Sequence, residues 1–103
     1  MNRRLICSSL CFLLPLAPLA QSIVALRING IINPVVADYV HRGIEKARSE
    51  KAECLLIELN TPGGLLKSTR FIVGDMLASP VPVVVFVSPA GAQAGSAGVF
   101  ITL

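Results

Sequence analysis

The residues with the clearest chemical potential lie in two glycine-containing segments, one near the middle and one near the end of the chain. The first is Asn60-Thr61-Pro62-Gly63-Gly64, and the second runs from Gly91 to Gly98. Glycines after a strand let a substrate approach the backbone, because no Cβ blocks it and positive φ is accessible. The Gly64 N–H is therefore a candidate donor to an oxyanion, although a tight turn alone also explains this composition.

Ser96 stands in the second segment among small neighbours, with Gly95 before it and Ala97 and Gly98 after it. A hydroxyl at the junction of a loop and a helix can project into a cleft, and the Ala97 amide at the helix start can face a developing negative charge. This is the chemistry of acyl transfer to a serine. Taken alone, a serine at such a junction is more often a helix N-cap.

A base for Ser96 is not evident in the sequence. His41 is the only histidine, and its place on the polar face of a predicted helix indicates a solvated side chain. A Ser-His-Asp triad is therefore unsupported. The spacing of potential metal ligands is also absent. We expect neither a metal nor another cofactor.

The spacing of apolar residues predicts the strands and helices that position these segments. Apolar runs predict strands at 23–28, 54–59 and 81–87, the second buried on both faces. Helical spacing predicts helices from Asn33-Pro34 onward, from Leu65 or Leu66 to Ala78, and from Ser96. The order β-α-β-α-β-α predicts an α/β fold with a parallel sheet and right-handed crossovers. Both glycine segments then lie beyond strand ends at one edge of the sheet.

Two finer expectations concern burial. Cys54, the only cysteine after the first twenty residues, is expected to be a buried thiol, because it opens an apolar strand. In the second helix, the side chains predicted to face the sheet are Leu66, Thr69, Ile72, Val73, Met76 and Leu77.

The first twenty residues have the order of a secretory signal. Arg3 and Arg4 precede an uncharged apolar run, and small residues then lead to Ala20, after which cleavage is expected. An uncleaved anchor is the alternative, since the uncharged stretch has borderline length for a membrane span. Without the two arginines the net charge of +3 falls to about +1. No basic cluster interleaved with aromatics indicates nucleic-acid binding.

Three segments together resemble the NfeD family of membrane-bound, Clp-type serine peptidases. They are 26–34, 59–65 and 82–98, and the resemblance extends from about Ile23 to Ile101. It implies a Clp-protease/crotonase-like fold, a Ser-Lys dyad and a preference for hydrophobic peptide segments, such as those of stomatin-like membrane proteins.

The resemblance also implies roles for individual residues. Ser96 matches the nucleophile, and Gly64 and Ala97 match the residues whose amides form the oxyanion hole. Gly63 and Gly95 support the loops that hold the substrate. The general-base lysine of the family falls several dozen residues beyond the serine, past the end of this sequence.

We therefore expect residues 1–20 to be a signal peptide or anchor and residues 21–103 to be the amino-terminal part of a Clp-protease-like domain, incomplete at its carboxyl end. The full-length protein is expected to be an exported, membrane-associated peptidase acting outside the cytoplasm on hydrophobic polypeptides. By analogy with the superfamily it is expected to form a homo-oligomer. This chain alone should be inactive, because a serine hydroxyl is a poor nucleophile without a base.

Three other functions share this arrangement. A signal-peptide-peptidase-A-like enzyme has the same fold and the same Ser-Lys chemistry. A non-catalytic membrane-assembly or partner-binding module uses the fold without the lysine. Acyl-CoA chemistry on a crotonase scaffold also uses paired backbone amides, but an export signal argues against it, since CoA thioesters are cytoplasmic.

Overall fold

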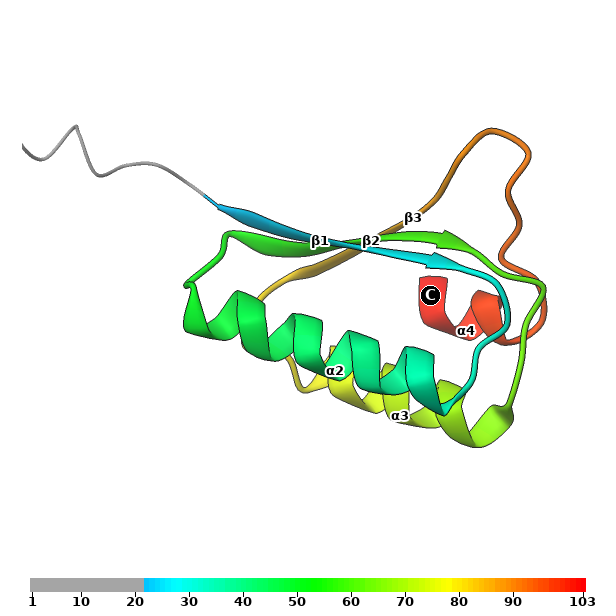
Figure 1. Ribbon diagram of the computed structural model, residues 1–103, viewed down its shortest axis with the longest axis horizontal. Coiled ribbons are helices and arrows are strands. Elements are labelled where there is room, and N and C mark those ends of the chain that lie inside the picture. The colour runs from blue at the N-terminus through cyan, green and yellow to red at the C-terminus, as the bar shows by residue number, and fades with distance from the viewer. Residues whose placement is uncertain (1–21) are drawn as a thin grey trace, which may run out of the picture.

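The structure is a computed structural model that describes residues 22–103 (Figure 1). The predicted signal peptide or anchor lies outside the described residues. Within them, no helix is both long enough and apolar enough to cross a membrane. The elements alternate in the predicted order: β1 (Ile23–Asn29), α2 (Pro34–Ser49), β2 (Cys54–Asn60), α3 (Leu66–Leu77), β3 (Val83–Val87) and α4 (Ala97–Thr102).

The three strands form a parallel sheet in the order β1-β2-β3. Because each crossover adds the next strand on the same side, right-handed connections place both crossover helices on one face of the sheet. Figure 1 shows α2 and α3 side by side on that face. The register pairs Asn29 with Asn60 and Leu59 with Val87, so all three strands end at the same edge.

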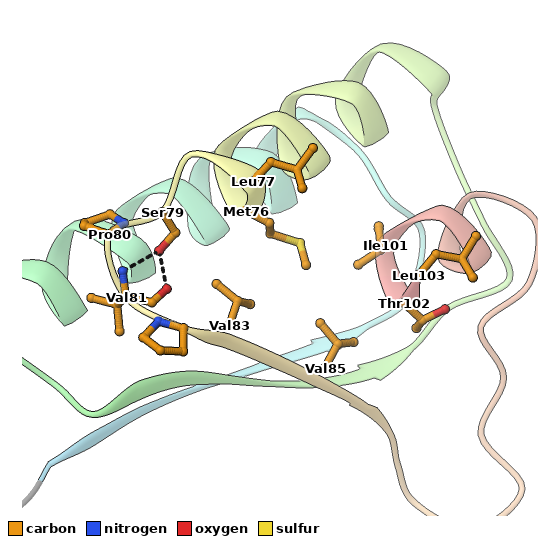
Figure 2. A pocket seen from close by; sticks show the side chains of 11 residues that line it. Met76, Leu77, Ser79, Pro80, Val81, Val83, Val85, Ile101, Thr102 and Leu103 are labelled. Carbon is orange, nitrogen blue, oxygen red and sulfur yellow. Dashed lines mark hydrogen bonds between the residues drawn. The ribbon is translucent and has the colours of Figure 1, made fainter.

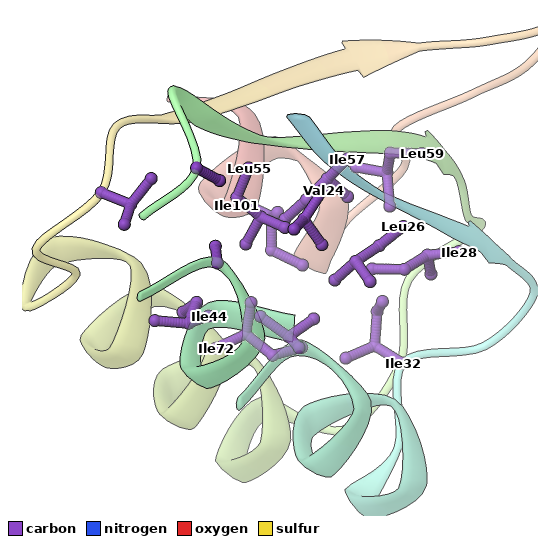
Figure 3. Close-up of a cluster of buried hydrophobic side chains, with 14 of the residues drawn as sticks. Val24, Leu26, Ile28, Ile32, Ile44, Leu55, Ile57, Leu59, Ile72 and Ile101 are labelled. Carbon is purple, nitrogen blue, oxygen red and sulfur yellow. The ribbon is translucent and has the colours of Figure 1, made fainter. Parts of the chain in front are cut away.

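The core fills the space between the sheet and the helices (Figure 3). Alternate residues of β1 and β2 point into it, and Ile57 at the centre of β2 is fully buried. Ile44 of α2, Ile72 of α3 and Ile101 of α4 meet them from the helical side. The short helix α4 therefore joins the same core, beneath the edge at which the strands end.

Helix α2 begins as predicted. The Asn33 side chain accepts a hydrogen bond from the Val36 N–H at 2.9 Å, and Pro34 occupies the first turn, where its missing N–H is not needed. Val40, Ile44 and Ala47 lie on its buried face.

Four expectations about burial were wrong. Leu66 and Leu77 do not face the sheet, being 61% and 84% exposed, because at 100° per residue they lie about 120° and 140° around the helix from the buried Ile72. The second strand is buried on one face only, since no helix of residues 22–103 covers the other face. Cys54 is accordingly half-buried.

The third strand also begins later than predicted. Ser79 binds both the N–H and the carbonyl of Val81 through its hydroxyl, at 3.1 and 2.7 Å (Figure 2), and this turn precedes the strand. Pro82 has no N–H to donate, so regular pairing starts at Val83.

Candidate active site

The two glycine segments lie next to each other, as predicted, and hydrogen bonds hold them beyond the strand ends. On one side, Ile32 donates its N–H to the Gly63 carbonyl and accepts from the Leu65 N–H, both at 2.9 Å. On the other side, Thr61 donates to the Gln93 carbonyl at 2.7 Å, and Gly95 donates to the Thr61 carbonyl at 2.8 Å. The first glycine segment is therefore the middle of three adjacent chain segments.

Gly63 adopts a conformation that favours glycine. Its φ is +125°, and Thr61 locks the turn by accepting from the Gly63 N–H at 3.0 Å and donating its hydroxyl to the Gly63 carbonyl at 3.1 Å. A Cβ at this position would lie 2.8 Å from Cβ of Ser96 and 3.3 Å from its Oγ. The glycine thus leaves the space that the Ser96 side chain occupies.

Gly64 is required for a different reason, which is close approach to another backbone. A Cβ there would overlap the carbonyl oxygen of Ile32 and would lie 2.6 Å from its nitrogen. Gly64 is paired with Ile32 in a parallel bridge. In this bridge the hydrogen bonds to Ile32 are made by the residues on either side of Gly64, which are Gly63 and Leu65. The Gly64 N–H therefore points away from Ile32, toward the side on which the Ser96 segment packs.

Ser96 precedes α4 in a rarely populated conformation, with φ +49° and ψ −110°. Its side chain forms no cap hydrogen bond, so the interpretation of this serine as a side-chain helix cap is wrong. The residue is exposed, and the Ala97 N–H that follows it is in the first turn of α4. A backbone of this kind costs about 1–3 kcal/mol and is typical of functional positions.

The geometry thus gathers all five predicted site residues at one edge of the sheet: Gly63, Gly64, Gly95, Ser96 and Ala97. An exposed hydroxyl stands over a glycine turn, with the Gly64 amide directed toward its side and the Ala97 amide next to it in sequence. This set of groups can supply a nucleophile and two donors to a developing oxyanion.

His41 and Lys67 lie in other surroundings. His41 of α2 is exposed, as predicted, and its Nδ1 lies 3.2 Å from an Asp75 oxygen on α3. Lys67 at the start of α3 borders a separate hollow together with Pro34 and Phe71. Among residues 22–103, no group of three or more His, Cys, Asp or Glu could hold a metal ion.

A hollow of about 510 Å³ lies between the end of α3, β3 and α4 (Figure 2). Met76, Val83, Val85 and Ile101 point into it, so much of its wall is apolar. Ser96 does not border this hollow. The candidate site lies instead at the edge where the strands end, and Ser96 is exposed there.

Two residues that support the site were missed from sequence. Thr61 is fully buried and fixes the glycine turn through its hydroxyl, and a threonine ahead of Pro-Gly could have suggested a side-chain turn. Ile32 holds the same turn through its backbone alone, which leaves no signal in residue type.

The chain is similar to several known proteins. The chain is 38% identical over 103 residues to the membrane-bound protease PH1510 of Pyrococcus horikoshii, covering 98% of this chain and 23% of that protein. Two mutant structures of 1510-N, a membrane-bound stomatin-specific protease, superimpose with a TM-score of 0.78 at 36% identity. A structure of 1510-N from Pyrococcus horikoshii superimposes with a TM-score of 0.73 at 39% identity. A serine-to-alanine mutant covers 82% of this chain and 41% of that chain. The match to a lysine-to-alanine mutant in complex with a substrate peptide covers 81% of this chain and 38% of that chain.

The fold extends to a more distant protein. A mutant of ClpP1 from Listeria monocytogenes superimposes with a TM-score of 0.69 at 23% identity, over 76% of this chain and 44% of that chain. The parallel β-α-β-α-β-α arrangement is thus Clp-protease-like, as the sequence resemblance implied. The family described as NfeD1b, N-terminal domain, matches residues 22–103. The chain therefore belongs to the NfeD1b amino-terminal domain family.

Proposed function

We propose that the full-length protein is a membrane-associated serine endopeptidase in which Ser96 is the nucleophile and a lysine beyond Leu103 is the general base. The observation that carries this proposal is the exposed Ser96 side chain. It forms no cap hydrogen bond, its backbone is held at φ +49°, and it stands against the Gly63 turn. A serine kept only for capping would use its hydroxyl to cap.

In the proposed reaction, Oγ of Ser96 attacks the carbonyl carbon of a peptide bond while its proton passes to the lysine. The carbonyl oxygen becomes an oxyanion that accepts hydrogen bonds from the Gly64 and Ala97 amides. The lysine then gives the proton to the departing amine, and water releases the acyl group from Ser96. Desolvation must lower the pKa of that lysine toward neutrality for it to act as a base.

The proposed substrate is a hydrophobic segment of a polypeptide, such as a stomatin-like membrane protein. Two lines of support exist. The related 1510-N is a stomatin-specific protease, and exposed apolar side chains follow the two glycine segments along the chain, at the start of α3 and on α4. They are Leu65 at 55%, Leu66 at 61%, Val99 at 45% and Phe100 at 63% exposure. We further propose that the domain acts outside the cytoplasm and as a homo-oligomer.

A non-catalytic partner-binding module is the second candidate. One fold can carry many functions, so this fold is compatible with such a module. Because a serine hydroxyl is a poor nucleophile without a base, we expect the 103-residue chain alone to be inactive.

Labelling the full-length protein with a fluorophosphonate probe separates the two candidates. The enzyme hypothesis expects covalent labelling that Ser96→Ala abolishes, together with loss of cleavage of a hydrophobic peptide. Ser49→Ala is the matched control, since Ser49 is an exposed serine whose hydroxyl bonds to a carbonyl of its own helix. Equal labelling of wild type and Ser96→Ala would remove Ser96 as the nucleophile.

A further inference from the structure

The chain segment that carries Ser96 makes a detour between β3 and the candidate site. The β3 ladder ends where the Ser88 N–H donates to the Leu59 carbonyl at 3.2 Å. The chain then loops out and returns at Gln93, whose carbonyl accepts from the Thr61 N–H. Figure 1 shows this loop rising away from the sheet before it reaches α4.

The detour deprives one amide of its regular acceptor. In a continuous parallel ladder with Thr61 paired to Ala94, the Gln93 N–H would donate to the Leu59 carbonyl. That carbonyl already accepts from Ser88. The Gln93 N–H instead donates to Oδ1 of Asn60 at 3.1 Å. The Asn60 side chain thus replaces a missing backbone acceptor.

Asn60 is itself held in place from its other side. Its Nδ2 donates to Oδ1 of Asn29 at 3.1 Å, and these two residues form the last register pair of β1 and β2. A line of hydrogen bonds therefore crosses the sheet edge from β1 through Asn60 to the returning loop. The Asn29 contact also fixes which side of the Asn60 amide faces Gln93.

The anchored amide is close to the proposed nucleophile along the chain. Gln93 is followed by Ala94, by Gly95 with its bond to the Thr61 carbonyl, and then by Ser96. Backbone bonds at Thr61 do not depend on any side chain, whereas the Gln93 bond depends on Asn60 alone. Small displacements at a reacting centre have large effects, since about 1 Å of misplacement can cost on the order of 100-fold in rate.

We propose that Asn60 is a positioning residue that holds the Ser96 loop in register with the Gly63-Gly64 turn. The proposal rests on the proposed function only for its effect on reactivity. The anchoring of the Gln93 amide is independent of what Ser96 does.

The test compares variants of the full-length protein by the rate of fluorophosphonate labelling and by hydrogen–deuterium exchange of the Gln93 amide. Asn60→Ala should label about 10- to 100-fold more slowly, with the Gln93 amide exchanging about tenfold faster. Asn60→Asp keeps the acceptor, and the Asn29 amide can rotate to donate to it, so both readouts should stay within about threefold of wild type. Gln93→Ala is the matched control, because it retains the N–H, and it should behave as wild type.

Several outcomes would overturn the proposal. Unchanged labelling and exchange in Asn60→Ala would do so, and so would an Asn60→Asp variant as impaired as Asn60→Ala, because the acceptor would then not be the cause. If Asn60→Ala does not fold, Asn29→Ala decides, with faster Gln93 exchange expected and unchanged exchange contradicting it. If wild type is not labelled at all, the proposed function fails, and the exchange data alone decide whether Asn60 anchors the loop.

Discussion

The substitution Gly64→Ala tests whether close approach of two backbones builds the candidate site. The added methyl carbon would meet the Ile32 carbonyl and lie 2.6 Å from the Ile32 nitrogen. An ordinary contact begins at 3.4 Å, so the two segments must separate by about 0.8 Å or more. Neither partner is a flexible side chain, and the strain cannot be relieved by a rotamer change.

The magnitude follows from the two hydrogen bonds that join these segments, both 2.9 Å long. Each contributes about 0.5–1.5 kcal/mol net, so their loss should lower the free energy of unfolding by about 1–3 kcal/mol. The same movement displaces the Gly64 N–H from the proposed oxyanion position. Loss of one oxyanion donor costs about 100- to 1000-fold in rate, and the full-length protein should lose labelling and cleavage accordingly.

The assay combines urea denaturation with fluorophosphonate labelling. Gly74→Ala is the matched control, because a Cβ at Gly74 of α3 meets nothing within 4 Å. It should raise helix stability by about 0.5–1 kcal/mol and leave labelling unchanged. Wild-type stability and labelling in Gly64→Ala would refute the reasoning, since the two backbones would then not be as close as the structure places them.

Three further outcomes are expected. Ile57→Ala removes a fully buried side chain from the centre of β2. It should lower the free energy of unfolding, measured by urea denaturation, by about 2–5 kcal/mol, and a loss below about 1 kcal/mol would contradict the burial of Ile57 in the core. Ser96→Ala should change stability by less than about 0.5 kcal/mol, because no side-chain cap is lost, whereas a true cap would cost about 1 kcal/mol. The hydrogen bond from Arg48 lowers the pKa of Glu45 below its ordinary value of 4.5, so the stability from this pair is present above the ordinary pKa and is lost as pH falls through the lowered one. An NMR titration should show the Glu45 pKa returning toward its ordinary value in Arg48→Met, and an unchanged pKa would contradict the pairing.

The sequence by itself determined the elements and their order. Short stretches of sequence encode the strand and helix periods, the Asn33-Pro34 helix start and the breaks at glycine and proline. These signals can therefore be recognised without knowledge of the rest of the chain. The parallel sheet followed from the alternation of elements, and the meeting of the two glycine segments followed from the parallel sheet. The signal at residues 1–20, the roles of the site residues and the lysine beyond Leu103 stay predictions.

Only the tertiary structure determines the geometry of the glycine segments. Whether Ser96 caps a helix or stands free depends on its backbone, which the packing of Gly63 against it and the Gly95 bond to Thr61 hold in place. The close approach of Ile32 to Gly64 joins residues about thirty positions apart, and residue type does not reveal it, because the contact is between backbones. The same holds for the exposure of Leu66 and Leu77, which depends on how far around α3 the sheet reaches. The candidate site was thus predictable as a place, because strand direction fixes the edge, while its geometry depends on contacts between segments that only folding brings together.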